Sequence, residues 1–224
     1  MKKTLTFPSK DGLLITADWY DRENPIWYIL LCHRSHCNRG EYQETALRLN
    51  ELGFSCLAID QRSGMKVWWY ENETKNRAKA QWLPTGYTNA IQDVEAWIEY
   101  LCELSKWNPI ILFWSSYSAS IALFVWKDSE KVQSIICFSP SEYLKWISIK
   151  DAISDLHKRT FITSAKGEID LVRRLLEKVD PKYITQFCPT VEGFHGSKTL
   201  WKEVPWNDTF WNALKGFLDM TSEW

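Results

Sequence analysis

Apolar and polar positions along the chain follow two spacings, one typical of strands and one typical of helices. Short apolar runs predict strands at residues 26–32, 54–59, 110–114, 132–138, 160–165 and 184–187. Apolar residues at helical spacing predict helices over 41–52, 88–105, 169–179 and 206–220, and another that begins at Ala119. Residues 4–7 and 13–20 flank Ser9-Lys10-Asp11-Gly12 and predict an antiparallel hairpin.

This order of elements predicts the fold class. Strands that alternate with helices after an initial hairpin indicate an α/β protein, with a mostly parallel twisted sheet and helices on both faces. The chain shows no repeats or linkers, so residues 1–224 are expected to form a single domain. Residues 60–87 lack periodicity and are expected to be a long functional loop. The stretch after Ser139 is too short for a folded cap domain.

The stretch from Pro109 to Trp126 joins a buried strand to a helix across a serine-rich turn. Such a turn lifts one side chain above the sheet edge, and the helix N-terminus beside it favours an oxyanion. Ser116 stands at that raised position, and Ser118 is the alternative because small residues flank it. From this stretch alone, a nucleophile and a packing turn are equally compatible with the residues.

Polar and titratable side chains directly follow the predicted strands, where parallel sheets bind their ligands. They are His33, Asp60, Ser116, Glu142, Glu168 or Asp170, and His195. Three of them occur in the order serine, acid, histidine, which is one order of a nucleophile, an orienting acid and a base.

Six segments in this order resemble the α/β-hydrolase superfamily, in particular small serine hydrolases of the dienelactone-hydrolase-like or esterase kind. The family's oxyanion loop resembles LLCHRSHCNRGEY, and its next helix and strand resemble LNELGFSCLAIDQRSG. Its nucleophile elbow resembles WSSYSA, and the following strand end resembles ICFSPSEY. Its acid turn resembles ITSAKGEID, and its histidine loop resembles EGFHGSKTLW. The resemblance implies an α/β-hydrolase fold over almost the whole chain.

The resemblance also implies roles for single residues. Ser116 would attack an acyl carbonyl, and His195 would take the proton and return it to the leaving group. Glu168 is the expected partner of His195, with Asp170 as the alternative because Gly167-x-x-Asp170 has the commoner spacing.

Four further residues are expected around the substrate. The backbone N–H groups of Tyr117 and Arg34 are the implied oxyanion donors. His33 and Tyr143 are expected beside the substrate, His33 as a structural histidine of the oxyanion loop. Tyr143, together with the side chains of Tyr117 and Trp68, would line an apolar acyl site.

These residues predict hydrolysis of a small carboxylic ester through an acyl-enzyme, without cofactor or metal. No cysteine stands at the elbow, which disfavours dienelactone as the substrate. The alternative is a non-catalytic protein of the same fold that binds a ligand or partner. Acyl transfer to another acceptor and the oligomeric state stay open.

Charge and composition narrow the setting. A net charge of −1 and a pI of about 6.4 give no indication of binding to nucleic acid or to an anionic membrane. The start of the chain has no apolar run of the signal-peptide type, so a soluble, cytoplasmic protein is expected. The six cysteines lack a C-x-x-C pair, and most are expected to be buried thiols.

Tryptophan is unusually frequent and glycine unusually rare. Ordinary glycine usage would give about 16 glycines in a chain of this length, but the sequence has 9 Gly and 14 Trp. Trp114 occupies an elbow position where glycine is expected, and Trp27 and Trp69 also stand where related sequences carry glycine. Three explanations compete: a repacked active elbow, a disabled elbow, and UGA codons that the source reads as glycine.

Overall fold

The computed structural model describes residues 2–67, 70–145 and 147–221. Trp68 and Trp69, to which the sequence assigns an acyl-site role and a glycine position, lie outside these ranges. The strands are ordered β1-β2-β4-β3-β5-β6-β7-β8. The chain divides into two compact units, residues 1–111 and 112–224, and each is described by itself. The prediction of a single domain stays a prediction.

The first unit begins with the predicted hairpin. β1 (Lys2–Pro8) pairs antiparallel with β2 (Leu14–Tyr20), and β2 pairs antiparallel with β4 (Ser55–Ile59). β3 (Tyr28–Cys32) runs parallel to β4. Every residue of β4 is buried, as expected of a continuous apolar strand in the middle of a sheet.

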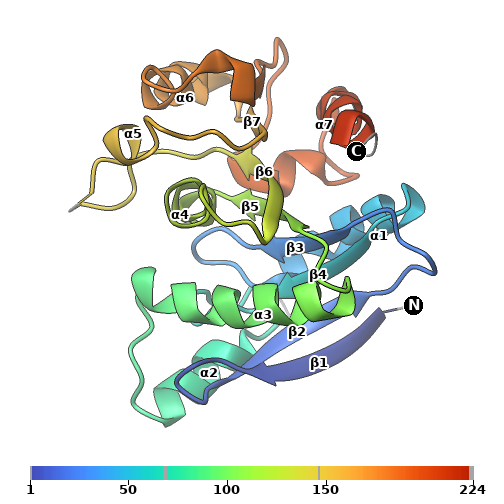
Figure 1. Cartoon of the computed structure of the whole chain (residues 1–224), viewed down its shortest axis with the longest axis vertical. Coiled ribbons are helices and arrows are strands. Elements are labelled where there is room, and N and C mark those ends of the chain that lie inside the picture. Colours follow the sequence, from blue (N-terminus) through green and yellow to red (C-terminus); the bar gives the residue numbers. More distant parts are fainter. Residues whose placement is uncertain (1, 68–69, 146, 222–224) are drawn as a thin grey trace. The chain divides into compact units, whose positions relative to one another are not determined.

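Helices cover these strands. The first unit contains η1 (Arg39–Tyr42), α1 (Gln43–Glu51), α2 (Glu73–Ala80), η2 (Thr88–Ala90) and α3 (Ile91–Leu104). α1 packs on β4, and α3 packs on β1 and β3 (Figure 1). The inward residues of α3 recur at helical spacing, with Val94, Ile98 and Leu101 all buried.

The second unit continues the alternation. Its strands are β5 (Ile110–Ser115, which begins at the end of the first unit), β6 (Val132–Phe138), β7 (Thr160–Thr163) and β8 (Ile184–Phe187). β7 runs parallel to both β6 and β8. The prediction of an α/β fold with a mostly parallel sheet is confirmed.

The second unit's helical segments are α4 (Tyr117–Val125), α5 (Ile149–Ala152), η3 (Lys166–Glu168), α6 (Ile169–Leu175), η4 (Pro181–Tyr183), η5 (Gly196–Leu200) and α7 (Asn207–Thr221). α4, α5 and α6 pack in succession (Figure 1). None of the helices in the described ranges is long and apolar enough to cross a membrane. The cytoplasmic location stays a prediction.

The loop predicted over residues 60–87 is wrong in its middle, where α2 forms. This helix buries only Thr74 and Ala78, so it has no apolar stripe for a pattern to detect. Its start is fixed by Asn72, whose side chain accepts a hydrogen bond from the Lys75 N–H at 2.8 Å. Local capping and good helix formers therefore outweigh the missing periodicity.

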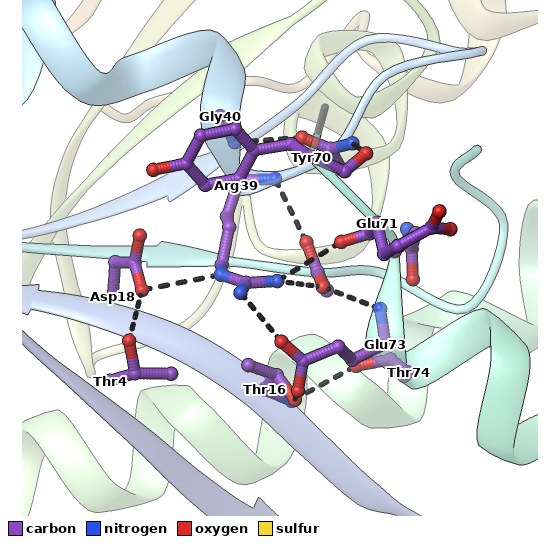
Figure 2. Close-up of polar contacts among 12 residues, drawn as sticks. Thr4, Thr16, Asp18, Arg39, Gly40, Tyr70, Glu71, Glu73 and Thr74 are labelled. Carbon is purple, nitrogen blue, oxygen red and sulfur yellow. Dashed lines mark hydrogen bonds and ion pairs between the residues drawn. The ribbon is translucent and has the colours of Figure 1, made fainter. Parts of the chain in front are cut away.

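A buried ion-pair network lies in the first unit (Figure 2). The Arg39 guanidinium pairs with Asp60, with Asp18 at 3.2 Å and with Glu73 at 2.8 Å. The Arg39 N–H also donates to Asp60 at 2.9 Å. Burial raises the pKa of Asp60 to about 6, although the Arg39 charge acts in the opposite direction. The network ties η1 to β2, β4 and α2.

Candidate active site

The turn between β5 and α4 holds Ser116 in a backbone conformation that side chains rarely adopt. Its φ is 60° and its ψ is −127°. The Ser116 N–H donates to the Phe138 carbonyl at 2.7 Å, and the Ser116 carbonyl accepts from the Ser120 N–H at 3.2 Å. The end of β6 and the first turn of α4 thus hold this strained residue, as in a nucleophile elbow.

A chain of two hydrogen bonds runs from Ser116 to Glu168. Ser116 Oγ lies 2.8 Å from His195 Nε2, and His195 Nδ1 lies 2.5 Å from Glu168 Oε1. Both distances are within reach of direct proton transfer. Because an ionised carboxylate only accepts, Nδ1 carries the imidazole proton and Nε2 accepts from the serine hydroxyl. All three residues belong to the second unit.

Glu168 is held by donors on its second oxygen. Oε2 accepts from Ser139 Oγ at 2.6 Å and from the Ala165 N–H at 3.2 Å. Burial raises the pKa of Glu168, but the hydrogen bonds from His195 and Ser139 outweigh it and leave that pKa below its usual value. Glu168 is therefore ionised at neutral pH and faces His195 as an anion.

Two serine hydroxyls fix the loop that carries His195. Ser139 Oγ accepts from the Gly196 N–H at 2.9 Å, and Ser115 Oγ accepts from the Ser197 N–H at 3.0 Å. Ser139 itself has a φ of 54°. Neither serine is predicted as a site residue from the sequence. The available signal was their position, since each ends or directly follows a strand beside a site residue.

A known protein family matches most of this chain in sequence. Residues 23–222 match the hydrolase family described as Serine aminopeptidase, S33. The chain belongs to this family. No curated protein matches the chain in sequence. The expected membership of the α/β-hydrolase superfamily is confirmed.

Solved structures show the same fold. The esterase Pf2001 of Pyrococcus furiosus is 16% identical with a TM-score of 0.76, and the alignment covers 98% of this chain and 92% of the esterase. A dienelactone hydrolase of Anabaena variabilis is 15% identical with a TM-score of 0.69, over 100% and 96% of the two chains. A putative dienelactone hydrolase of Klebsiella pneumoniae is 8% identical with a TM-score of 0.73, over 100% and 99%.

The structure separates the alternatives that the sequence left open for this hydrolase. Asp170 is exposed on α6 and pairs with Arg173 at 3.1 Å, whereas Glu168 contacts His195. The alternative of Asp170 as the acid is therefore wrong. Likewise, the residue in contact with His195 is Ser116, while Ser118 lies buried within the first turn of α4.

The two predicted oxyanion donors lie in different units. Tyr117 follows Ser116 and opens α4, the position from which an elbow presents its N–H. Arg34 belongs to the first unit, where its N–H donates to Glu41 Oε2 at 2.8 Å. An oxyanion would have to compete with that carboxylate, so the geometry of the first unit does not favour Arg34 as a donor.

His33 is structural and does not offer its ring to a substrate. The side chain is fully buried, Nε2 accepts from the Gln61 N–H at 3.0 Å, and Nδ1 lies 2.8 Å from the Arg34 carbonyl. Burial lowers its pKa to about 4, so the ring is neutral. The expectation that His33 lies beside the substrate is wrong for the side chain.

Tyr143 lies next to His195, and its expected contact with a substrate stays a prediction. The two rings meet edge to face with centroids 6.5 Å apart, and the Tyr143 hydroxyl donates to the Ser139 carbonyl at 3.2 Å. The Tyr117 side chain is buried, which does not support its expected place in an acyl site. Glu142 accepts from the N–H groups of Ile149 and Lys150 and so caps α5.

Proposed function

We propose that this hydrolase cleaves a small carboxylic ester through a covalent acyl-enzyme on Ser116. The observation that carries the proposal is the hydrogen-bonded chain of Ser116, His195 and Glu168. A nucleophile, a base and an orienting anion in contact are the parts that acyl transfer requires.

In the first half-reaction, Ser116 Oγ attacks the carbonyl carbon of the ester while His195 Nε2 takes the hydroxyl proton. The imidazolium that forms is stabilised by Glu168, which accepts from its Nδ1–H. The oxyanion develops near the N-terminus of α4, where the Tyr117 N–H and the helix dipole favour negative charge. Collapse of the intermediate breaks the ester bond, and His195 gives its proton to the leaving alcohol.

In the second half-reaction, a water molecule repeats the attack on the acyl carbon. His195 takes a proton from this water, and the tetrahedral intermediate collapses to release the carboxylic acid. Ser116 Oγ recovers its proton from His195. The side chain of His195 is 38% exposed, so water can reach the ring that must activate it.

The short segment after β6 favours small esters over long-chain lipids. Its only helix among the described residues is α5, with four residues, which cannot form a cap domain. The alternative of a non-catalytic binding protein is less favoured, because a disabled elbow has no need for an aligned serine, histidine and carboxylate.

Hydrolysis of p-nitrophenyl esters with increasing acyl length tests the proposal. The wild type should turn over the short esters fastest, and Ser116→Ala should lose about 10⁴-fold or more in kcat. Ser118→Ala is the matched control in the same turn and should keep most of the activity. Full activity in Ser116→Ala would contradict the proposal, and faster cleavage of aminoacyl p-nitroanilides would contradict the ester assignment.

A further inference from the structure

Three exposed tryptophans adopt the left-handed backbone conformation that favours glycine. The φ angles are 58° at Trp82, 67° at Trp107 and 66° at Trp206. Eight non-glycine residues in the described ranges have a positive φ, and three of them are tryptophan. A bulky residue is an outlier in this region, because its Cβ crowds the neighbouring carbonyl.

The indole rings gain little in return for this strain. Trp82 is 95% exposed, Trp107 is 64% exposed and Trp206 is 65% exposed. An apolar ring that stays in water contributes little of the free energy that burial would supply. The backbone conformation at these positions is therefore set by the surrounding turns and not by the tryptophan side chains.

Trp82 stands at the glycine position of a helix-ending motif. The Trp82 N–H donates to the Lys79 carbonyl at 3.1 Å, and the Leu83 N–H donates to the Ala78 carbonyl at 2.9 Å. This pair of bonds defines a Schellman motif at the end of α2, with Trp82 as the left-handed residue. Glycine is the usual residue there, since it has no Cβ.

Trp107 and Trp206 also lie next to helix ends, but in different positions from Trp82. At the end of α3, the Trp107 N–H donates to the Cys102 carbonyl at 2.6 Å, directly after Lys106, which also has a positive φ. Trp206 precedes α7, and its carbonyl accepts from the Thr209 N–H at 3.0 Å. After α3 the position equivalent to Trp82 is held by Lys106, whose N–H donates to the Glu103 carbonyl at 3.1 Å, and Trp107 is the next residue. At Trp107 and Trp206 the features that favour glycine are the positive φ and the exposed ring.

Other tryptophans are buried and have packed rings or a bonded indole N–H. Trp97 and Trp211 lie within α3 and α7 and are 1% and 2% exposed. Trp97 packs edge to face on Tyr100, with centroids 5.2 Å apart, and Trp211 Nε1–H donates to the Leu200 carbonyl at 2.9 Å. The chain thus contains two populations of tryptophan with opposite structural requirements.

We infer that positions 82, 107 and 206 carry glycine in the protein that the cell makes, whereas Trp97 and Trp211 are true tryptophans. The first three codons are UGA, which the source reads as glycine, and the last two are UGG. The exchange at three positions changes the counts from 14 Trp and 9 Gly to 14 − 3 = 11 Trp and 9 + 3 = 12 Gly, and so reduces both the excess of tryptophan and the shortage of glycine.

Position 114 is a separate case, because Trp114 is 0% exposed and packs edge to face on Trp126, with centroids 4.9 Å apart. Trp114 stands two residues before Ser116, where the elbow motif G-x-S-x-G has its first glycine. A UGA codon there would give the elbow its usual small residue. Because its burial is that of a true tryptophan, we leave position 114 out of the inference.

Reading the codons and the peptide masses of the protein isolated from its source tests the inference. We expect UGA codons and glycine-containing peptides at positions 82, 107 and 206, with UGG and tryptophan at 97 and 211. UGG codons at the first three positions would overturn the inference, as would UGA at 97 and 211. None of these results depends on hydrolase activity.

Recombinant variants test the physical basis separately. Trp82→Gly, Trp107→Gly and Trp206→Gly should each raise the folded-to-unfolded ratio about threefold or more, because glycine relieves the left-handed strain. Trp97→Gly and Trp211→Gly are the controls and should lower that ratio at least about a hundredfold. A loss of stability in the first three variants would show that the indoles are needed and would contradict the inference.

Discussion

The molecule contains two clusters of charged and basic side chains that look alike in sequence but differ in their surroundings. Around Arg39, the cation is 8% exposed, and Asp18 and Asp60 are 1% and 0% exposed. Around His195, the ring is 38% exposed and Glu168 is 26% exposed. In both clusters, a carboxylate contacts a cationic or basic side chain that lies far from it in the sequence.

The difference in surroundings distinguishes a cluster that stabilises the fold from a cluster that can carry out a reaction. The Arg39 guanidinium meets three carboxylates, and Asp60 also accepts from backbone N–H groups. Glu73 at the edge of that cluster is 43% exposed, but every carboxylate in it meets a cation, and the cluster stabilises the first unit. The His195 cluster ends at the hydroxyl of a strained serine, with a histidine that water can reach. A reaction requires a nucleophile and a base that substrate and water can reach, and this cluster, called the open cluster below, provides both.

The largest expected effect comes from neutralising the acid of the open cluster. Glu168→Gln removes the anion that faces His195 and should lower kcat for ester hydrolysis by about 10²–10⁴-fold. Asp170 lies two residues later, at the start of α6. Asp170→Asn is therefore the matched control and should leave kcat within about twofold of wild type. Equal losses in the two variants, measured at matched folded concentration, would remove the distinction between the two acids.

The cluster around Arg39 should respond in stability and not in chemistry. Arg39→Met leaves Asp60 buried without its cation and Asp18 with Lys2 alone, and it should lower the free energy of unfolding by about 3–5 kcal/mol. Arg173→Met removes an exposed ion pair and should change it by less than about 1 kcal/mol. Urea unfolding of both variants measures the difference. An unchanged midpoint in Arg39→Met would show that the network does not hold the first unit together.

Buried His33 predicts a dependence of stability on pH. Its folded pKa of about 4 is below the unfolded value of about 6.5. The unfolded chain therefore takes up a proton that the folded chain refuses, and this contribution to stability is present above pH 6.5 and is lost as the pH falls toward about 4. The slope is at most about 1.4 kcal/mol per pH unit.

His33→Asn isolates this contribution, because Asp60 and the other carboxyl groups titrate in both proteins. The stability difference between wild type and variant, followed by urea unfolding from pH 7 to pH 4, should shrink as the pH falls. A difference that is constant over this range would show that His33 is not a buried neutral group.

Ser139 gives the smallest expected effect and tests how the open cluster is positioned. Ser139→Ala removes a donor to Glu168 and the acceptor for the Gly196 N–H. The pKa of Glu168 should rise as a result, so activity should be lost at a higher pH than in wild type as the pH falls. We expect kcat at neutral pH to fall about tenfold. An unchanged acid limb of the pH–rate profile would exclude this role.

The sequence predicts most elements of the fold because apolar spacing reports burial directly. β6 and β8 were predicted with their observed bounds, and the hairpin and α3 differ from the prediction only at their ends. α2 could not be found in this way, because its stability depends on capping and propensity and not on an apolar face. α4 begins at Tyr117, earlier than predicted, since the serines at its start are buried.

The site is only partly readable from the sequence. Ser116, Glu168 and His195 follow strands and match known motifs, so their meeting could be expected. Ser139 and Ser115 act through single hydroxyl contacts that no spacing rule predicts. The choice between Glu168 and Asp170 depends on which carboxylate faces the histidine loop. The two residues are two positions apart at the start of a helix, so their side chains point in different directions.

Labelling with a fluorophosphonate, followed by mass-spectrometric location of the adduct, tests the central claim most directly. The account predicts a single adduct on Ser116 in the wild type, with His195→Ala labelled far more slowly and Ser116→Ala not labelled at all. Should Trp114 obstruct the elbow in the recombinant chain, the same adduct would form faster in Trp114→Gly. Absence of label from folded wild type and from folded Trp114→Gly, or an adduct on another serine, would contradict the account.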